Sequence, residues 1–589
     1  MRFARARAFN ALAHADMRRI LTSLIGAAAV FVTAVAVYVA VTLPPRALGV
    51  TAVRDPRVVW GAYHVHSDRS DGGGSVEDIA LAAADAGLHF VILTDHGDGT
   101  RVPDPPQYRH GVLVIDAVEL NSTGGHVVAL NLRDGAPFPL AGETRDVIED
   151  VHRFGGLAIA AHPDSPRPGL RWRARGPQEL DGIEWINLDS AWRAHGPWTL
   201  SGVGLRSLVR GPEAIATLLT TPLPGLALAD STNRTNRTVV LAALDAHARL
   251  GADADHGASG GWGVSFPSYR TLFRTLAQAV RIRAPWSGNA ADDSAALLAG
   301  LSQGRAFSVT RALADGLPSV TFSARQGDRL VEMGGELPGG AQTEFLVEVG
   351  GLPDVRLQLL RDGRPVAQGR NGLRAPVNGE AGAYRVEMYA GEHAVPWVVT
   401  NAIRLARQMP GAGAGPLGPG GGGAAEGGAI ESLAVAVRPD AWKIEADPAT
   451  RASLTVEGSE LRLSYKLAGG APSGQYVALS TSAAGDLPLT RIELMLRSPR
   501  PMRVSVQVRT PGGTDGYRWR RSVFVDATPR PLSIRLSELE PIERGSTLRP
   551  NVARVQSVLL VIDTVNALPG SAGELVVVQA RLVPGRPAG

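Results

Sequence analysis

The sequence predicts a multidomain fold, in which an N-terminal transmembrane helix is followed by an α/β unit and then by two all-β units. Three observations predict it. A long uncharged apolar run lies near the N-terminus, strand-like and helix-like segments alternate between residues 58 and 310, and helical periodicity disappears from Pro318 onward. The chain has 589 residues, too many for one hydrophobic core, and roughly 150 residues per domain suggests about three or four units.

The first element, residues 1–45, is a short tail followed by an apolar helix. No charged residue occurs from Ile20 to Leu43, a run long enough to cross a bilayer, and Pro44 and Pro45 end it. Its apolar character on every side argues against a buried core helix. Its length, the residues before it and the lack of a small-x-small site after it argue against a cleaved signal peptide.

The arginines that flank this helix predict its orientation. Five precede it and three follow it, namely Arg2, Arg5, Arg7, Arg18 and Arg19 before, and Arg46, Arg54 and Arg57 after. The positive-inside rule then places the N-terminus in the cytoplasm. We therefore expect a single-pass, membrane-anchored protein whose bulk is extracytoplasmic, either periplasmic or on the cell surface.

The second element, residues 46–312, has the pattern of an α/β unit. VEDIALAAADAG is a helix-like segment followed by the strand-like LHFVILTDH, and TRDVIEDVHRFGG is followed in the same way by LAIAAH. Strands that alternate with helices are typical of a largely parallel sheet or barrel.

The remainder of the chain predicts two β units. Residues 313–408 read as a β-sandwich, with Asp362-Gly363 as a hairpin signal. Residues 409–431 are Gly-rich and form a linker, because such sequence buries too little surface to offset its ordering entropy. Residues 432–589 read as a jelly-roll-like β domain by their strand pattern.

Composition excludes several classes of site. The formal net charge of +4 is small for this length, so no nucleic acid is expected as a partner. The chain has no cysteine, which excludes disulfides and zinc–thiolate sites. Any bound metal must therefore be held by histidine, aspartate and glutamate.

Residues of these types follow the apolar runs of the α/β unit. His64 and His66 form an H-x-H pair on a strand, where residues two apart project to the same side, and Asp71 follows in a Gly-rich turn. Further such residues stand at or near other strand-like runs, namely Asp95, His96, Glu119, His126, His162, Asp245 and His247. Strand ends converge on one face of an α/β barrel, so the pattern predicts a metal site there.

The order of these motifs, H-x-H, S-D-G, T-D-H-G, Glu, His, A-H-P and D-A-H, resembles the PHP (polymerase and histidinol phosphatase) domain family. The likeness is to membrane-anchored or secreted PHP metallohydrolases with C-terminal β domains. It covers roughly residues 58–312, including the closing segment SAALLAGLSQGRAFSVT. The resemblance implies a distorted (β/α)7 barrel with two or three divalent metal ions, either zinc, manganese or iron.

The resemblance also implies a role for each ligand. One ion would be held by His64, His66, Glu119 and Asp245. Glu119 would bridge to a second ion held by His126 and His162. A third would be held by Asp71, His96 and His247. Asp95 would orient a metal ligand through hydrogen bonds, or relay a proton, and would not bind metal itself.

The leading hypothesis is a PHP-type phosphoesterase that hydrolyses a small phosphate mono- or diester through a metal-bound hydroxide. One alternative is a metal-dependent carboxylester or carbamate hydrolase. Another is a noncatalytic surface protein that binds glycan through the C-terminal domain, where three aromatic residues either stack on sugars or belong to the core, namely Trp442, Tyr517 and Trp519.

Three further features of the α/β unit are candidates for a role in the site. Glu184 and Asn187 are candidates for substrate contact. The arginines after A-H-P would clamp an anion or lie in a solvated loop, namely Arg167, Arg171, Arg173 and Arg175. The Gly-rich segment from Gly251 to Pro267 is a lid or an ordinary surface loop.

Overall fold

The computed structural model describes residues 2–51, 55–174, 179–220, 224–234, 236–249, 266–407, 435–470, 474–483, 488–512, 516–543, 547 and 549–585. The linker expected at 409–431 lies outside these residues. So do Arg175 and nearly all of the candidate lid, of which only the last two residues are described.

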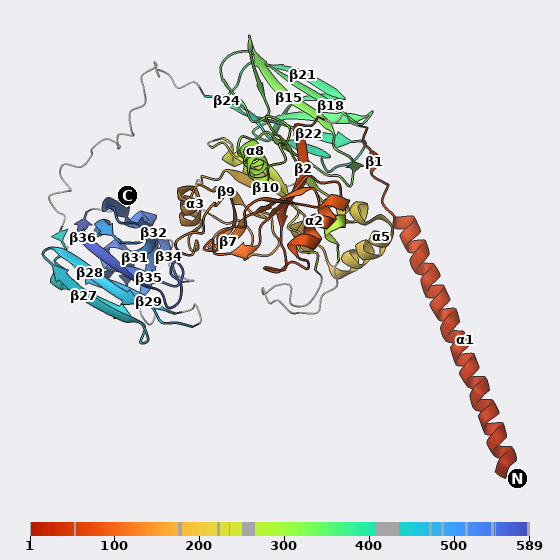
Figure 1. Cartoon of the computed structure of the whole chain (residues 1–589), viewed down its shortest axis with the longest axis horizontal. Coiled ribbons are helices and arrows are strands. Elements are labelled where there is room, and N and C mark those ends of the chain that lie inside the picture. Colours follow the sequence, from red (N-terminus) through yellow and green to blue (C-terminus); the bar gives the residue numbers. More distant parts are fainter. Residues whose placement is uncertain are drawn as a thin grey trace.

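The N-terminal element is one helix, α1 (Arg2–Thr42). Its stretch Ile20–Thr42 is long and apolar enough to cross a membrane, and none of it is buried against the rest of the chain. Figure 1 shows α1 projecting from the body as a single rod. The apolar helix is thus confirmed, while its insertion in a membrane stays a prediction.

The α/β unit contains two sheets. In the described residues the larger has twelve strands, in the order β17-β24-β22-β23-β13-β12-β2-β3-β6-β5 with β19 and β20 attached through β22. Its strands are β2 (Val58–Val65), β3 (Phe90–Leu93), β5 (Gln107–Arg109), β6 (Val112–Asp116), β12 (Ala277–Arg281), β13 (Ala306–Val309), β17 (Glu336–Pro338), β19 (Val355–Arg361), β20 (Arg364–Arg370), β22 (Gly382–Ala390), β23 (Val398–Thr400) and β24 (Ile403–Ala406). Pairing is parallel across β2, β3 and β6.

The second sheet of this unit has the order β11-β10-β9-β8-β7-β4. Its strands are β4 (His96–Gly97), β7 (Val118–Ser122), β8 (Gly125–Leu130), β9 (Leu157–Ala160), β10 (Gly182–Asn187) and β11 (Val239–Ala243). β8 runs antiparallel to both of its neighbours. The reason is local: the short turn between Ser122 and Gly125 can join only antiparallel strands, because a parallel crossover needs a dozen or so residues.

Backbone hydrogen bonds join the two sheets at both seams. At one seam the amide of Leu244, the residue after β11, donates to the carbonyl of Tyr63 in β2 at 3.1 Å. At the other the Glu119 amide donates to the Asp95 carbonyl at 3.2 Å. The observed fold is therefore multidomain and β-rich with a mixed α/β unit, and the distorted seven-stranded barrel stays a prediction.

Helices cover the α/β unit. They are α2 (Val76–Asp85), α3 (Thr144–Arg153), α4 (Leu188–Arg193), α5 (Pro197–Ala216), α6 (Pro224–Thr232), α7 (Tyr269–Phe273) and α8 (Ala290–Ser302). α2 begins at a capping box, in which the Ser75 side chain accepts from the Asp78 amide and the Asp78 carboxylate accepts from the Ser75 amide. The helix-then-strand pairs expected at α2–β3 and α3–β9 are confirmed.

No α-helix follows Ser302 in the described residues, as the loss of helical periodicity predicts. A four-stranded sheet, β16-β15-β18-β21, follows the α/β unit; its strands are β15 (Ser319–Gln326), β16 (Arg329–Glu332), β18 (Thr343–Gly350) and β21 (Gly372–Val377). The second layer consists of β17, β19, β20, β22, β23 and β24, and β23 pairs with β13. The sheet thus runs across the expected boundary at residue 312, and the domain boundaries stay predictions.

The Asp362-Gly363 hairpin is confirmed. These two residues join β19 to β20, with Arg361 opposite Arg364. Their φ angles are +49° and +81°, and positive φ at both central residues is what a two-residue turn of type I′ requires.

The C-terminal unit is a sandwich of two antiparallel sheets in the described residues, β27-β28-β36-β30-β33 with β25, and β26-β29-β35-β31-β32-β34. Its strands are β25 (Val435–Ala436), β26 (Trp442–Ala446), β27 (Arg451–Glu457), β28 (Glu460–Lys466), β29 (Tyr476–Ser482), β30 (Leu489–Arg497), β31 (Met502–Thr510), β32 (Tyr517–Val525), β33 (Arg530–Arg535), β34 (Glu540–Pro541), β35 (Ser557–Asp563) and β36 (Ala572–Pro584). Trp442 and Trp519 belong to its core, while Tyr517 is exposed.

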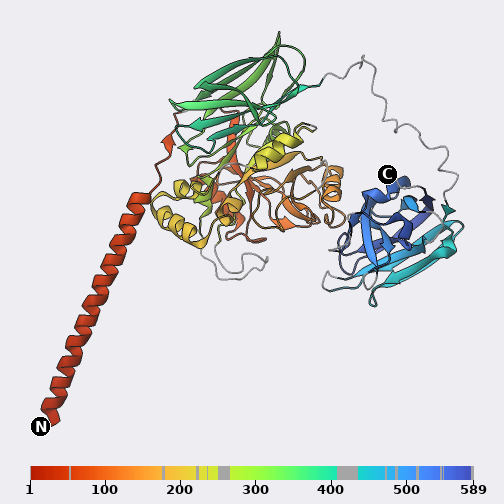
Figure 2. The ribbon, with the colours of Figure 1, turned by 180° about the vertical axis from the view of Figure 1, so that it is seen from behind.

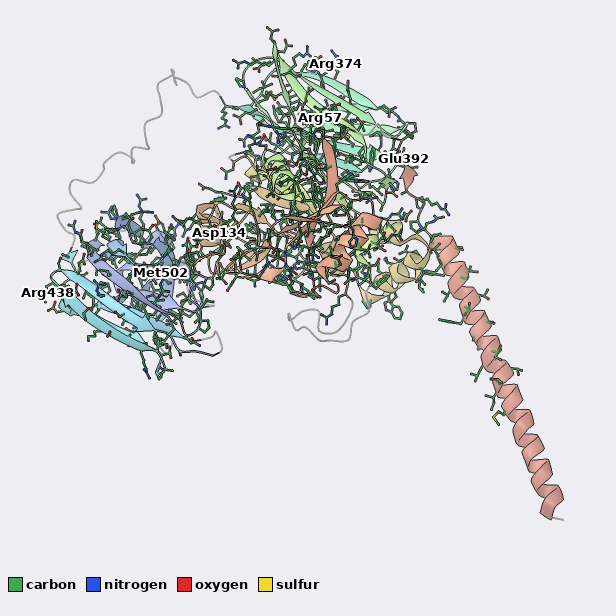
Figure 3. All side chains as sticks on the ribbon, viewed as in Figure 1. Arg57, Asp134, Arg374, Glu392, Arg438 and Met502 are labelled. Atoms are coloured by element: carbon green, nitrogen blue, oxygen red, sulfur yellow. The ribbon has the colours of Figure 1, made fainter. Side chains whose placement is uncertain are left out.

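The C-terminal unit packs against α3 of the α/β unit, as Figure 2 shows from behind. Arg503 on β31 is buried there, with Nε 2.5 Å and Nη2 2.9 Å from the Asp150 carboxylate. The Arg153 guanidinium lies 3.9 Å from the centre of the Phe524 ring. In Figure 3 the labelled Asp134 and Met502 lie on the neighbouring sides of the two units.

Candidate metal centre

The nine predicted metal ligands come together at one end of the two sheets. Most stand at the carboxyl ends of β2, β9 and β11 or in the turns that follow them. His126 lies at the start of β8, and because β8 is antiparallel its start lies at that same end. His64 and His66 are fully buried, whereas the His96 side chain is 33% exposed. The cluster is thus covered on one side and open near His96.

Glu119 lies at the centre of the cluster and is itself buried. Its Oε2 atom faces three ring nitrogens at 3.2–3.4 Å, those of His64, His66 and His96. Its Oε1 atom faces two more at 2.7–2.8 Å, those of His126 and His162. One carboxylate therefore lies between two groups of histidines.

Two aspartates complete the cluster. The Oδ1 atom of Asp245 lies 3.4 Å from His64 Nε2 and 3.2 Å from His66 Nε2. Asp71 lies with Oδ1 3.4 Å from His66 Nδ1 and with Oδ2 3.1 Å from His247 Nε2 and 3.6 Å from His96 Nε2.

Three overlapping groups in the cluster have ligand atoms all within 4.8 Å of one another, namely His64, His66, Glu119 and Asp245; His66, Asp71, His96 and His247; and His96, Glu119 and His126. Imidazole nitrogens with carboxylate oxygens form a donor set that suits zinc, manganese and iron. The residues present therefore fit divalent ions.

The cluster strains the backbone. His64, His162 and Asp245 have φ angles of +63°, +29° and +48°, and such values in residues other than glycine cost about 1–3 kcal/mol each. At His64 the register between β2 and β3 shifts. The Nε2 atoms of His64 and His66 do meet, at 3.1 Å, but the expected reason, simple alternation along a strand, is wrong. A bulge at His64 turns its ring inward.

Opposite charges stabilise this arrangement. Burial lowers the pKa of His66, but its bonds to Asp245 and Glu119 outweigh burial and raise that pKa to about 10. Burial raises the pKa of Glu119, but the charges of His64 and His96 hold it well below its usual range. Imidazole rings and carboxylates of opposite charge thus meet in one cluster, and bound cations would replace the imidazole protons.

Glu184 on β10 supports the cluster from behind and is fully buried. Its Oε1 atom lies 2.5 Å from His64 Nδ1, and its Oε2 atom accepts from the His162 amide at 2.7 Å. The Asn187 side-chain amide donates to Glu184 at 3.0 Å and to Asp245 at 3.3 Å. Both residues thus contact predicted ligands, whereas the role expected for them from the sequence was contact with substrate.

Asp95 holds the turn that carries the ligands. Its Oδ1 atom accepts from the Ser67 amide and the Ser70 hydroxyl, each at 2.7 Å, and its Oδ2 atom accepts from the Ser67 hydroxyl at 2.7 Å. The Tyr269 hydroxyl, which sequence reasoning missed, donates to the His66 carbonyl at 2.7 Å and lies 3.2 Å from the His247 carbonyl. Both side chains fix backbone next to ligands.

A pocket of about 200 Å³ adjoins Asp245 and His247. Three arginines contribute to its wall, Arg167, Arg193 and Arg249. Apolar side chains complete much of the lining, namely Leu188, Trp192, Ile215, Leu244, Phe266 and Leu272. Of the other arginines after A-H-P, Arg171 donates to the Ser165 carbonyl at 2.8 Å instead.

No family model matches the sequence. The uncharacterized protein MJ1587 of Methanocaldococcus jannaschii is 32% identical over 137 residues, which cover 21% of this chain and 79% of the archaeal protein. This chain belongs to the MJ1587 family. Membership in the MJ1587 family rests on that shared segment, and the name of the archaeal protein assigns no activity.

Two solved structures are similar to parts of this MJ1587-family chain. A two-domain protein from Bacteroides vulgatus that contains a predicted PHP-like metal-dependent phosphoesterase is 13% identical, with 61% of this chain and 99% of that one covered at a TM-score of 0.27. The family 11 carbohydrate-binding module of Clostridium thermocellum, in complex with a mixed-linked tetrasaccharide, is 14% identical, with 26% and 96% covered at 0.22. At these TM-scores neither likeness establishes fold or function.

Proposed function

We propose that this chain is a metal-dependent hydrolase of the PHP type that cleaves a small phosphate mono- or diester. The observation that carries the proposal is Glu119, whose two carboxylate oxygens face two separate groups of histidines inside one cluster. A carboxylate so placed could bridge neighbouring ions, and pairs of ions about 3.5–4 Å apart are a common arrangement in metal-dependent hydrolysis.

The ligands divide among two or three ions. His64, His66, Glu119 and Asp245, whose ligand atoms lie within 4.8 Å of one another, would hold the first. Glu119 would bridge to a second ion with His126 and His162. Asp71, His96 and His247 would hold a third, which His66 also approaches. Bound ions would lower the pKa of a water and polarise a phosphoryl oxygen.

The chain's own side chains would bind and orient the substrate. Arg167, Arg193 and Arg249 line the pocket beside Asp245 and His247, where guanidinium groups suit a phosphate because they can bind two of its oxygens at once. Glu184 would set the ring of His64, and Asp95 would hold the turn of Asp71. The strained backbone at three ligand positions also supports a functional site, since folding alone gives no reason to retain such strain.

The hydrogen bonds at both seams between the sheets support a closed β/α barrel around the cluster. In such barrels the site lies at the carboxyl ends of the strands, where these ligands are found.

Metal content tests the proposal. The purified full chain should contain two or three divalent ions by elemental analysis, and His64→Ala and Asp245→Ala should lose at least one. His110→Ala is the matched control, because His110 is exposed and pairs with Glu77 at 2.7 Å, away from the cluster. If the chain binds no metal after reconstitution with zinc, manganese or iron, the proposal of a metal-dependent hydrolase is refuted.

A substrate screen separates the enzymatic alternatives. The loaded chain should hydrolyse phosphate mono- or diesters, with the activity absent in His64→Ala. Activity confined to carboxylesters or carbamates would replace the phosphoesterase by the second kind of hydrolase.

The glycan-binding alternative depends on the C-terminal unit. Trp442 and Trp519 are buried in its core, which leaves Tyr517 as the exposed member of the three aromatic candidates. Binding of the full chain to a glycan array, with no metal in the cluster, would favour this alternative over the enzyme.

We further propose that α1 anchors the chain in a membrane and that the body is extracytoplasmic. The apolar stretch Ile20–Thr42 supports the anchor, and the flanking arginines support the orientation. A topology reporter fused after Pro45 should be active only outside the cytoplasm, and a cytoplasmic reporter would reverse the orientation.

A further inference from the structure

Helix α5 exposes large apolar side chains. Trp198, Leu208 and Val209 are 91%, 80% and 62% exposed. Trp198 and Leu208 are the two most exposed large hydrophobic residues of the described chain outside α1. Single exposed apolar residues are ordinary on a protein surface. Three on one helix, with exposure this complete, indicate a surface that something apolar covers.

α1 crosses α5 on the side that carries Trp198 and Val209, while Leu208 lies about 80° from Trp198 around the helix axis. A Cβ atom at Gly202 would come within 2.5 Å of the Tyr38 hydroxyl, so the two helices are in close contact there. At 3.6 residues per turn, Gly202 and Val209 lie within about 40° of Trp198 around the helix axis. The exposed Trp198 and Val209 therefore flank the crossing of α1, one on each side.

This crossing lies at the end of the apolar stretch. Tyr38 is within Ile20–Thr42, about one turn from its end. Arg206 of α5 donates to the Thr42 carbonyl at 3.5 Å, and Arg210 donates to the Pro44 carbonyl. α5 thus contacts the residues that would stand at the membrane surface. Figure 1 and Figure 2 both show α5 beside that end of α1.

Only a short segment separates the end of α1 from the first residues that are fixed to the body of the protein. The Ala47 amide donates to the Glu213 carboxylate at 3.2 Å. Immediately afterwards β1 (Leu48–Gly49) pairs in parallel with β14 (Ala314–Asp315). Since the chain is fixed to the body within a few residues of Thr42, the body cannot move far from the bilayer on a loose tether.

We propose that α5 is a second membrane contact, which inserts Trp198, Leu208 and Val209 into the interfacial region of the bilayer that α1 spans. Tryptophan is enriched at that level because its ring is amphipathic, and a helix with an exposed apolar side lies in the interface plane. The occupant is lipid, because α5 contacts the membrane-exit end of α1 itself. This inference rests on the proposed membrane anchor and is independent of the proposed chemistry.

The absence of cysteine from the chain makes a site-specific test direct. Single-cysteine variants of the full chain, reconstituted in phosphatidylcholine vesicles and labelled with an environment-sensitive fluorophore, would be exposed to lipid that carries a nitroxide quencher. Leu208→Cys is the test position. Val37→Cys, in the apolar stretch and 56% exposed, is the positive control, and Leu330→Cys on β16, 54% exposed, is the negative control.

We expect the fluorophore at residue 208 to be quenched several-fold more than that at residue 330. Equal quenching at 208 and 330, with strong quenching at 37, would overturn the second contact and leave the anchor standing. Absence of quenching at 37 would overturn both, whereas the metal content of the same preparation would report on the hydrolase separately.

Discussion

The carboxylate of Glu184 lies 2.5 Å from the Nδ1 atom of His64, one of the predicted metal ligands. A proton on Nδ1 shared with this carboxylate leaves Nε2 of the same ring directed at Glu119, 3.2 Å away. The partner of a ligand's second ring nitrogen fixes the tautomer and orientation of the ring. Glu184 is therefore placed to orient His64 as a metal ligand.

Glu184→Ala should weaken metal binding by about 10–100-fold, because the partners of metal-binding histidines typically have effects of that size. Glu184→Gln should fall between Ala and the natural residue, since its amide oxygen can still accept from Nδ1. Competition with a chelator measures the affinity. Glu77→Ala is the control, because Glu77 pairs with the exposed His110. Unchanged affinity in Glu184→Ala would refute the positioning role.

Arg503→Met should destabilise the docking of the C-terminal unit on α3 by about 3–5 kcal/mol, because it removes the central cation of a buried ion-pair network. Both oxygens of Asp150 lie within 2.9 Å of Arg503, and without Arg503 this carboxylate would keep only Arg153, whose Nε atom is 3.7 Å away. Urea unfolding and limited proteolysis of the full chain would measure the loss.

The matched control for this variant is Arg530→Met. Arg530 pairs with Asp526 at 2.9 Å but is 57% exposed, and exposed ion pairs contribute only about 0–1 kcal/mol. Similar losses in the two variants would show that burial of Arg503 is unimportant.

The stability of the folded chain should fall as pH rises from about 4.5 to about 8, because the pKa of Glu143 is higher in the folded state. Burial, with the charges of Asp146 and Glu540, raises the pKa of Glu143 from 4.5 to about 8, against the opposing charges of Arg520 and Arg145. The folded state then binds a proton that the unfolded state releases above about pH 4.5. The contribution of this proton to the free energy of unfolding is complete below about pH 4.5 and is lost as pH rises to about 8.

Glu143→Gln should reduce the dependence of the free energy of unfolding on pH, because the amide does not titrate. The free energy of unfolding measured at several pH values between 4 and 9 tests it. The variant should gain stability relative to the natural chain as pH rises, and parallel curves for the two proteins would contradict the assignment.

Gly363→Ala should destabilise the β-sandwich that contains the β19–β20 hairpin. The loss should exceed the cost of backbone strain at position 363 alone. Gly363 has φ +81°, and an added Cβ would meet the Asp230 carboxylate at 2.6 Å. That carboxylate accepts from Arg385 at 2.8 Å, so the methyl group would disturb a buried ion pair. Thermal unfolding would measure the loss.

Gly391→Ala separates the two effects. Gly391 also has positive φ, +55°, but no described atom lies within 4 Å of the added methyl. Gly391→Ala should show only the cost of placing an alanine at positive φ, about 1–2 kcal/mol. Equal losses of thermal stability in the two glycine variants would show that the contact with Asp230 does not contribute to the effect of Gly363→Ala.

The sequence alone could indicate the ligand cluster because ligand-type side chains stand at the ends of apolar runs. His64, Glu119 and Asp245 are far apart in the chain, yet a sheet brings strand ends to one edge whatever lies between them. The roles of the individual ligands stay predictions. The expectation of a largely parallel sheet was wrong at β8, where a hairpin too short for a crossover reverses the strand, and at β12, which runs antiparallel to both β2 and β13.

The features that could be predicted from the sequence are local: an uncharged helix, helix-then-strand alternation, the Asp362-Gly363 turn and the residue types available for metal. Features that depend on non-local packing are visible only in the folded chain. The bulge at His64, the carboxylate of Glu184 behind it, the burial of Trp442 and Trp519 and the contact of α5 with α1 each join segments distant in the chain. Periodicity reports which side of an element is apolar, and it cannot report what that side meets.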